Sequence, residues 1–380
     1  MKNDTDMKDT KLNYMLNVVC RWAVGLVFLF SSFVKGVDPM GTTFKVQEYM
    51  TAWSIGGLTF EWALPFAEFL SVALICAEFL VGVLLIFNAY RRLSAWLLVL
   101  MMLFFTVTTL VDAITNKVTD CGCFGDAVKL TNWQTFWKNI ALDVPTVFIF
   151  LTRNLRRKRR FERDGLILIF AVAAMLVFEI YNIKHEPVID FRPWKIGNQM
   201  MDLESTEGMK SYVTYRNTKT GESEEFESAQ LMDKLSDSEW AAEWEWESSR
   251  VVDPREIAAP GFSMLDLEGE DRAIDLLPAE DGMLIVTVHH IDKVNDKGLR
   301  EVKRAVALAE DNGIKIVMLT AALPEEVQAW MADNDISGLD YLFADATAIE
   351  TMMRGNPGFM YVKNATVVDK GRKAGELKIN

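Results

Sequence analysis

Cysteine is scarce in this chain, with four residues among 380, at positions 20, 76, 121 and 123. No cysteine follows Cys123. The rest of the chain can therefore neither form a disulfide nor exchange one. Histidine is scarcer still, with three residues, and none lies near Cys121 or Cys123 in the sequence.

An excess of basic residues is also absent, because the net charge is −13. Residues 1–182 carry 18 Lys and Arg against 15 Asp and Glu, and residues 183–380 carry 22 against 38. Phosphate contacts need Lys and Arg, so the acidic second half argues against a nucleic-acid partner.

A small-residue cleavage site is missing after the first apolar run, and the first 15 residues are charged and polar. We therefore expect no cleaved signal peptide, and we expect the first run to remain as a membrane anchor.

Long apolar runs are what the first half does contain, and five are candidates for membrane spans: Val18–Val37, Pro65–Phe87, Leu93–Ile114, Phe136–Thr152 and Gly165–Ile183. About 20 mostly apolar residues cross the hydrocarbon core as a helix. The fourth run is the weakest, because it contains Lys138, Asp143 and Pro145. Its alternative is a re-entrant or interfacial helix.

Basic residues predict the orientation of these spans, because they flank spans on the cytoplasmic side. They precede the first run, separate the second from the third, and fill residues 153–163 between the fourth and fifth. If every run crosses, the N-terminus is cytoplasmic. The loop 116–133 and everything after about residue 184 then lie outside the membrane, in the periplasm of a bacterium.

The segment "TDCGCFGDA", residues 119–127, places Cys121 and Cys123 in that outer loop. An oxidising compartment lets a disulfide persist, and Gly122 permits the tight turn that would join the two thiols. Such a small strained ring favours disulfide exchange. A soft-metal site and a simple turn with incidental cysteines remain as alternatives.

Acidic residues within the apolar runs are costly in hydrocarbon and therefore need an explanation. Glu78 lies deep in the second run, and Glu68, Asp112 and Asp143 lie nearer the outer side. They either handle protons or line a polar quinone pocket, or they bond to Lys35, Lys138 or Asn139 and join the helices.

Residues 15–155 resemble the DoxX/MauE-type redox-associated membrane proteins. The resemblance is carried by "GLVFLFSSFVKGVDP" with Ser32 and Lys35, "CAEFLVGVLLIF" with Glu78, "DCGCFGD", and "TFWKNIAL" with Asn139. It implies thiol–disulfide chemistry outside the membrane and transfer of electrons to a membrane quinone. It makes Cys121 and Cys123 the catalytic pair and Lys35, Glu78 and Asn139 the candidates for contacting a cofactor, although no cofactor is evident from the residues themselves.

The second half begins with a β-rich connector, residues 185–258, in which a strand, a turn at 219–221 and a return strand precede a group of tryptophans. From residue 259 strands and helices alternate in the order β-α-β-α-β-α-β-β. This order, "APGFSMLDLEG" and Asn356-Pro357 resemble a membrane-tethered thioredoxin-like domain. The resemblance implies a cis-proline at Pro357, but the usual CxxC is replaced by "HHIDKVNDKG".

His289 and His290 end a predicted buried strand, Gly282–His290. Neighbours on a strand point to opposite faces, so we expect them not to share one metal ion. With Asn356 and Pro357 they are predicted to line a groove that binds an extended client peptide.

The predicted fold is thus an α-helical transmembrane bundle of four spans plus a fifth tethering span, followed by an α/β thioredoxin-like extracytoplasmic domain. Its parts are the membrane domain 1–155, a basic cytoplasmic loop and fifth span 156–184, the connector 185–258 and the thioredoxin-like domain 259–380. The predicted function is that of an inner-membrane thiol–disulfide oxidoreductase, whose partners are the lipid bilayer and an extracytoplasmic protein or peptide. A non-catalytic assembly or recruitment factor and a metal-handling membrane protein are the alternatives.

Overall fold

The computed structural model describes most of the chain: residues 4–55, 58–118, 122–153, 161–201, 210–219, 221–227, 231, 234, 240, 243–252, 259 and 262–379. The chain divides into two compact units, a membrane unit of residues 1–192 and a C-terminal unit of residues 193–380.

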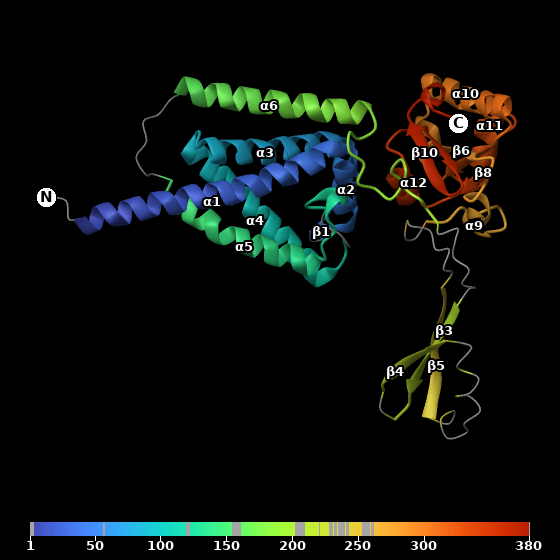
Figure 1. The fold of residues 1–380 in the computed structure, drawn as a ribbon, viewed down its shortest axis with the longest axis horizontal. Coiled ribbons are helices and arrows are strands. Elements are labelled where there is room, and N and C mark those ends of the chain that lie inside the picture. The colour runs from blue at the N-terminus through green and yellow to red at the C-terminus, as the bar shows by residue number, and fades with distance from the viewer. Residues whose placement is uncertain are drawn as a thin grey trace. The chain divides into compact units, whose positions relative to one another are not determined.

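Within its described residues, the membrane unit is built of six α-helices (Figure 1). They are α1 (Asp4–Val37), α2 (Pro39–Ala52), α3 (Ala67–Phe87), α4 (Arg91–Thr115), α5 (Asn132–Leu151) and α6 (Phe161–Lys184), with 3-10 turns η1 (Glu61–Phe66) and η2 (Gly125–Ala127) and a short pairing of β1 (Ser54–Ile55) with β2 (Leu58–Thr59). Many large apolar side chains on these helices are exposed, such as Leu103 and Phe104 on α4. Such a surface is suited to lipid.

Among the described residues, four segments are long and apolar enough to cross a membrane: Lys11–Val37, Glu61–Phe87, Arg91–Thr115 and Glu162–Lys184. They contain the first, second, third and fifth of the predicted spans. The fourth predicted span, Phe136–Thr152, forms the helix α5, but this helix is not among the four. Lys138 and Asp143 lower its mean hydropathy.

The helix α2 was not predicted from the sequence. Asp38 is its N-cap, where the carboxylate accepts a hydrogen bond from the Gly41 backbone N–H at 3.0 Å, and Pro39 is its first residue. Both are common signals of a helix start.

The helices α1 and α3 approach each other closely at two glycines. A Cβ added to Gly82 would lie 3.1 Å from the carbonyl oxygen of Gly25, and one added to Gly25 would lie 3.2 Å from that of Gly82. Small residues at a helix crossing let the two backbones pack directly, which is a common way to join helices in membranes.

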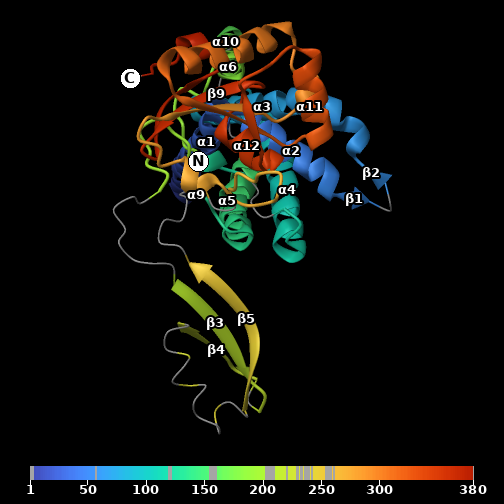
Figure 2. The same cartoon turned by 90° about the vertical axis from the view of Figure 1, so that its right-hand side faces the viewer.

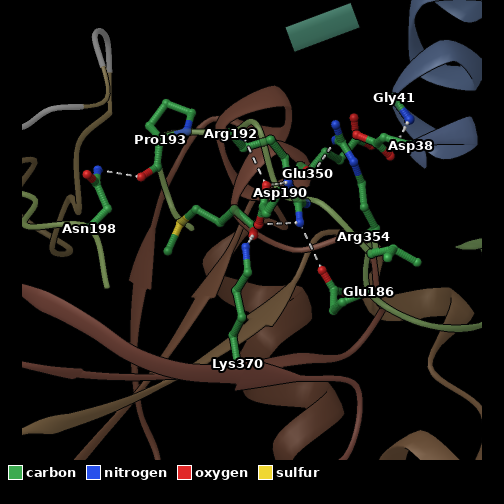
Figure 3. Close-up of polar contacts among 12 residues, drawn as sticks. Asp38, Gly41, Glu186, Asp190, Arg192, Pro193, Asn198, Glu350, Arg354 and Lys370 are labelled. Atoms are coloured by element: carbon green, nitrogen blue, oxygen red, sulfur yellow. Dashed lines mark hydrogen bonds and ion pairs between the residues drawn. The ribbon is translucent and has the colours of Figure 1, made fainter. Parts of the chain in front are cut away.

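A buried arginine fixes the segment that follows α6 (Figure 3). The Arg192 guanidinium donates to Asp190 at 2.7 and 2.9 Å and to Glu186 at 3.0 Å, and its side chain is 1% exposed. Burial alone would lower the pKa of Arg192, but the two carboxylates outweigh it and raise that pKa above its ordinary value. Arg192 therefore stays charged in this clamp.

The C-terminal unit contains a five-stranded mixed sheet with the order β10-β9-β6-β7-β8. Its strands are β6 (Met283–Val288), β7 (Lys315–Thr320), β8 (Asp340–Phe343), β9 (Gly358–Lys363) and β10 (Thr366–Gly371), and its helices are α9 (Ala273–Leu276), α10 (Asp296–Asn312), α11 (Pro324–Asp333) and α12 (Ala346–Met352). From β6 onward the elements follow the predicted order. β6, β7 and β8 are parallel, while β9 and β10 are antiparallel to their neighbours.

Apolar cores cover both faces of this sheet. Ile285 packs with Ile349 of α12 in one core, and Val286 packs with Val302 of α10 in the other. All six residues of β6 are buried. A strand that is buried on both faces reads as a continuous apolar run, and this is why β6 could be predicted.

A separate three-stranded antiparallel sheet has the order β4-β3-β5 and is formed by β3 (Lys210–Asn217), β4 (Ser223–Glu227) and β5 (Trp244–Val252) (Figure 2). Trp240 and Trp244 stack with their ring centroids 5.4 Å apart, and Trp240 also contacts Tyr215 and Phe226. The tryptophans therefore form a small aromatic core.

Candidate functional site

The outer loop between α4 and α5 carries the cysteines. Cys121 lies outside the described residues, so its position cannot be compared with the prediction. Gly122 and Gly125 adopt positive φ angles of 62° and 49°, and the Gly125 N–H donates to the Gly122 carbonyl at 3.0 Å. Cys123 therefore lies within a tight turn that glycine makes accessible.

This turn packs closely against the first two helices. A Cβ added to Gly122 would lie 3.3 Å from the Lys45 side chain of α2, and one added to Gly125 would lie 3.2 Å from Val34 of α1. The ring of Phe124 lies 5.4 Å from that of Phe30, between centroids. The loop is thus held at one end of α1.

Ser31 links the loop to the interior of the membrane unit. Its Oγ lies 2.8 Å from the carbonyl oxygen of Cys123 and 3.0 Å from Oε2 of Glu78. A hydroxyl group has only one hydrogen to donate, and both neighbours are acceptors. The single Ser31 hydroxyl hydrogen is therefore shared between the Cys123 carbonyl and the Glu78 carboxylate.

Lys35 completes this group, one helical turn after Ser31. Its Nζ lies 2.5 Å from Oε1 of Glu78, and the two side chains are 7% and 1% exposed. The Lys35 ammonium also lies 5.4 Å from the centre of the Phe105 ring. Two buried opposite charges tolerate this environment only as a pair, since a lone charge would be strongly destabilising.

Asn139 and Lys138 have other partners. The Asn139 side chain donates to Thr109 Oγ1 at 3.1 Å, and the Lys138 ammonium lies 4.4 Å from the Phe124 ring centre. Asn139 therefore joins α5 to α4, while Lys35 and Glu78 bond to each other.

Two further acids and one thiol bond to side chains of other helices. Asp112 accepts from Tyr49 at 2.6 Å and Asp143 accepts from Thr106 at 2.9 Å. The Cys76 thiol lies 3.0 Å from Glu179 Oε2, where it joins α3 to α6. These contacts join helices, but the partners of Asp112 and Asp143 are Tyr49 and Thr106 rather than the expected Lys138 or Asn139.

A second polar cluster lies in the C-terminal unit, at the end of β6. The strand ends at Val288, so His289 and His290 lie beyond it. The His290 N–H and carbonyl both bond to the Asn356 side chain, at 3.4 and 2.7 Å, and the Asn356-Pro357 peptide bond is cis. The four residues predicted to line a groove are therefore neighbours.

Glu350 of α12 joins this cluster, and sequence reasoning missed it. Its Oε1 lies 3.9 Å from Nδ1 of His289, too far for a hydrogen bond. One ligand atom from each of His289, His290 and Glu350 lies within 4.8 Å of the others. The expectation that adjacent histidines face apart depended on a strand geometry that residues 289 and 290 do not have.

Burial shifts the titration of the cluster. Burial and the neighbouring His290 lower the pKa of His289 to about 4, and burial raises the pKa of Glu350 to about 7. Burial also lowers the pKa of His290. At neutral pH His289 is thus an uncharged imidazole, and the His289–Glu350 contact is not an ion pair.

Residues 13–152 match the family model of methylamine utilisation protein MauE. This MauE-like segment contains Ser31, Lys35, Glu78 and the cysteine loop, and ends at the close of α5. The helix α6 and the C-terminal unit lie outside it. No curated protein and no solved structure matches the chain.

Proposed function

We propose that this chain is an inner-membrane thiol–disulfide protein in which Cys121 and Cys123 alternate between dithiol and disulfide. The observation that carries the proposal is the hydrogen-bonded series from Lys35 through Glu78 and Ser31 to the Cys123 carbonyl. Oxidation of a dithiol releases two protons with its two electrons. The buried Glu78 carboxylate, which Ser31 links to the loop, is suited to take up one of these protons.

The proposed cycle is a balanced exchange. A client thiolate attacks the Cys121–Cys123 disulfide, and the second client thiol resolves the mixed disulfide, so the client leaves oxidised and the loop is left as a dithiol. Reoxidation of the loop dithiol releases two electrons and two protons, and a membrane quinone held by Lys35 and Glu78 would accept them.

The proposal requires the loop to face the periplasm, and the helix ends support this. The Arg91 guanidinium donates to the Thr152 carbonyl at 3.2 Å, so the basic start of α4 lies beside the end of α5. At the opposite ends of these helices, Asn132 bonds to Asn116 and Val118. The 20 residues of α5 measure about 30 Å, the thickness of the hydrocarbon core. We therefore propose that α5, the fourth predicted span, also crosses the membrane, which brings the number of proposed crossings to five.

The C-terminal unit is proposed to be thioredoxin-like and to hold the client. The parallel pair β6 and β7 and the antiparallel β9 and β10 in one five-stranded sheet support this architecture. Because no cysteine follows Cys123, its role is binding. The same observation favours the second candidate function, that of a recruitment factor without catalysis.

Redox titration of the full chain in lipid nanodiscs tests the proposal. After equilibration at defined potentials, free thiols are alkylated and counted by mass spectrometry. We expect residues 121 and 123 to lose alkylation together, in one two-electron step, and the Cys20→Ser variant to behave identically. If both thiols stay alkylated in oxidising buffer, the redox function is wrong.

Two further measurements address orientation and catalysis. In cells with a permeable outer membrane, an impermeant maleimide is expected to label Cys123 but not Cys20. The Cys121→Ser/Cys123→Ser variant is expected to abolish client oxidation at normal protein abundance. Full function in that variant would instead support the recruitment factor.

A further inference from the structure

We propose that His289, His290 and Glu350 of the C-terminal unit bind a divalent transition-metal ion of the zinc class. The site is separate from the cysteine loop in sequence and chemistry. Its donors are two imidazole nitrogens and one carboxylate oxygen, all within 4.8 Å of one another. This donor set is one that holds Zn²⁺ with three protein ligands and leaves a fourth position for water or a substrate.

The backbone beyond β6 brings the two adjacent imidazoles together. His289 and His290 follow the last strand residue, and their ring centroids lie 5.3 Å apart with planes at 66°. Asn356 bonds both backbone polar groups of His290, which fixes the turn from the side of the cis-proline loop. The convergence of the rings is therefore held by a contact between distant segments.

The separations are close to those that an ion requires. Zinc binds imidazole nitrogen and carboxylate oxygen at about 2.0–2.2 Å, so two tetrahedral ligands lie about 3.4 Å apart. His289 Nδ1 and Glu350 Oε1 lie 3.9 Å apart, so a shift of about half an ångström closes this pair. His290 is exposed and free to adjust its side-chain rotamer.

Metal binding at this site is expected to depend on pH. A histidine ligand must be uncharged and a carboxylate ligand must be ionised, so an ion that binds here displaces any protons that the three ligands hold.

Two cations face the cluster and limit its affinity. Lys293 and Arg354 both lower the pKa of His289, so their positive charge reaches the site. Lys293 is exposed to solvent, which screens its charge. Arg354 directs one guanidinium nitrogen to the backbone carbonyl of Glu350 at 2.6 Å. We expect a site of moderate affinity, suited to an exchangeable ion.

Metal titration of the full chain tests the site. The protein is prepared in detergent micelles without a polyhistidine tag and with Cys121→Ser and Cys123→Ser, so that thiolates do not compete. Zn²⁺ is titrated against a chromophoric chelator, and Co²⁺ is used as a spectroscopic probe. We expect one equivalent to bind, with Co²⁺ absorption typical of a four-coordinate site with nitrogen and oxygen ligands.

The variants separate this site from adventitious binding. His290→Gln, Glu350→Gln and His289→Gln are each expected to weaken Zn²⁺ binding by about tenfold or more. His185→Gln, which changes the chain's one other histidine, is the matched control and is expected to leave binding unchanged. Because His290 is exposed, its variant should fold even if that of His289 does not.

Three results would overturn the proposal: no stoichiometric binding, binding unaffected by His290→Gln and Glu350→Gln in folded protein, or an equal loss in His185→Gln. The Cys121→Ser/Cys123→Ser background also separates this test from the proposed redox function, since either can fail without the other.

Discussion

Ser31 Oγ lies 2.8 Å from the carbonyl oxygen of Cys123, so a side chain within α1 holds the backbone of the cysteine loop. The same oxygen contacts Glu78. A single hydroxyl group therefore links the loop to the buried ion pair. We expect substitution of Ser31 to change the accessibility of the Cys123 thiol.

Ser31→Ala should loosen the loop. One hydrogen bond contributes about 1 kcal/mol, so we expect alkylation of Cys123 that depends on local opening to become about fivefold faster. The rate is measured with a small iodoacetamide on the Cys20→Ser/Cys76→Ser background in micelles. Ser32→Ala is the control, because the Ser32 hydroxyl donates to Leu29 within α1. Equal rates in both variants would show that Ser31 does not hold the loop.

Lys35 and Glu78 should behave as a coupled pair. Lys35→Met or Glu78→Gln alone removes one partner of a buried contact, and we expect each to destabilise the membrane unit by about 3–5 kcal/mol. The double variant should lose much less than the sum of the two, because no buried charge remains unpaired. Thermal unfolding in detergent measures the four proteins of this cycle. Additive losses would contradict a direct pair.

The contact between α1 and α3 gives a packing prediction. Gly82→Ala places a methyl group 3.1 Å from the Gly25 carbonyl oxygen and 2.9 Å from Leu29, so we expect a loss of about 1–3 kcal/mol. Gly165→Ala in α6 is the matched control, because its methyl group would meet Tyr90 at an ordinary 3.6 Å. Thermal unfolding of both variants checks this. Equal stability would mean that the two helices adjust at no cost.

The sequence predicted those elements whose side chains leave a periodic or continuous pattern. The apolar runs gave the membrane helices, and the buried run from Met283 to Val288 gave β6. The helix α2 was missed because its composition is mixed, although Asp38 and Pro39 form a recognisable helix start.

The polar contacts depend on which way each helix face is turned and on how the elements pack, and neither can be predicted well from the sequence. Ser31 and Ser32 are adjacent, and the sequence drew attention to Ser32. Ser31 lies four residues before Lys35, and this spacing puts the two on the same face of a helix. That spacing could have pointed to Ser31. Glu350 could not be connected to His289, because the two belong to different elements 61 positions apart. Their proximity arises only when α12 packs on the sheet.

The stability of the C-terminal unit should depend on the ionisation of Glu350. Its pKa rises from 4.5 to about 7 on folding, mainly through burial, with Asp345 raising it and Lys293 and Arg354 lowering it. At low pH Glu350 is protonated in both the folded and the unfolded protein. As the pH rises from 4.5 to 7, Glu350 ionises in the unfolded protein first, which favours unfolding. The contribution of Glu350 to stability therefore falls through this window, by up to about 3 kcal/mol.

Glu350→Gln cannot ionise and should remove this loss. Measured with a chelator present, the unfolding temperature of the variant should increase relative to that of the wild type between pH 4.5 and 7 and then level off. The histidines titrate in both proteins, so their effect cancels in the difference. His289, whose pKa is lowered to about 4, gives the opposite trend, with stability lost as the pH falls from 6.5 towards 4. A difference between variant and wild type that is constant with pH would mean that Glu350 is ionised at neutral pH like an exposed carboxylate.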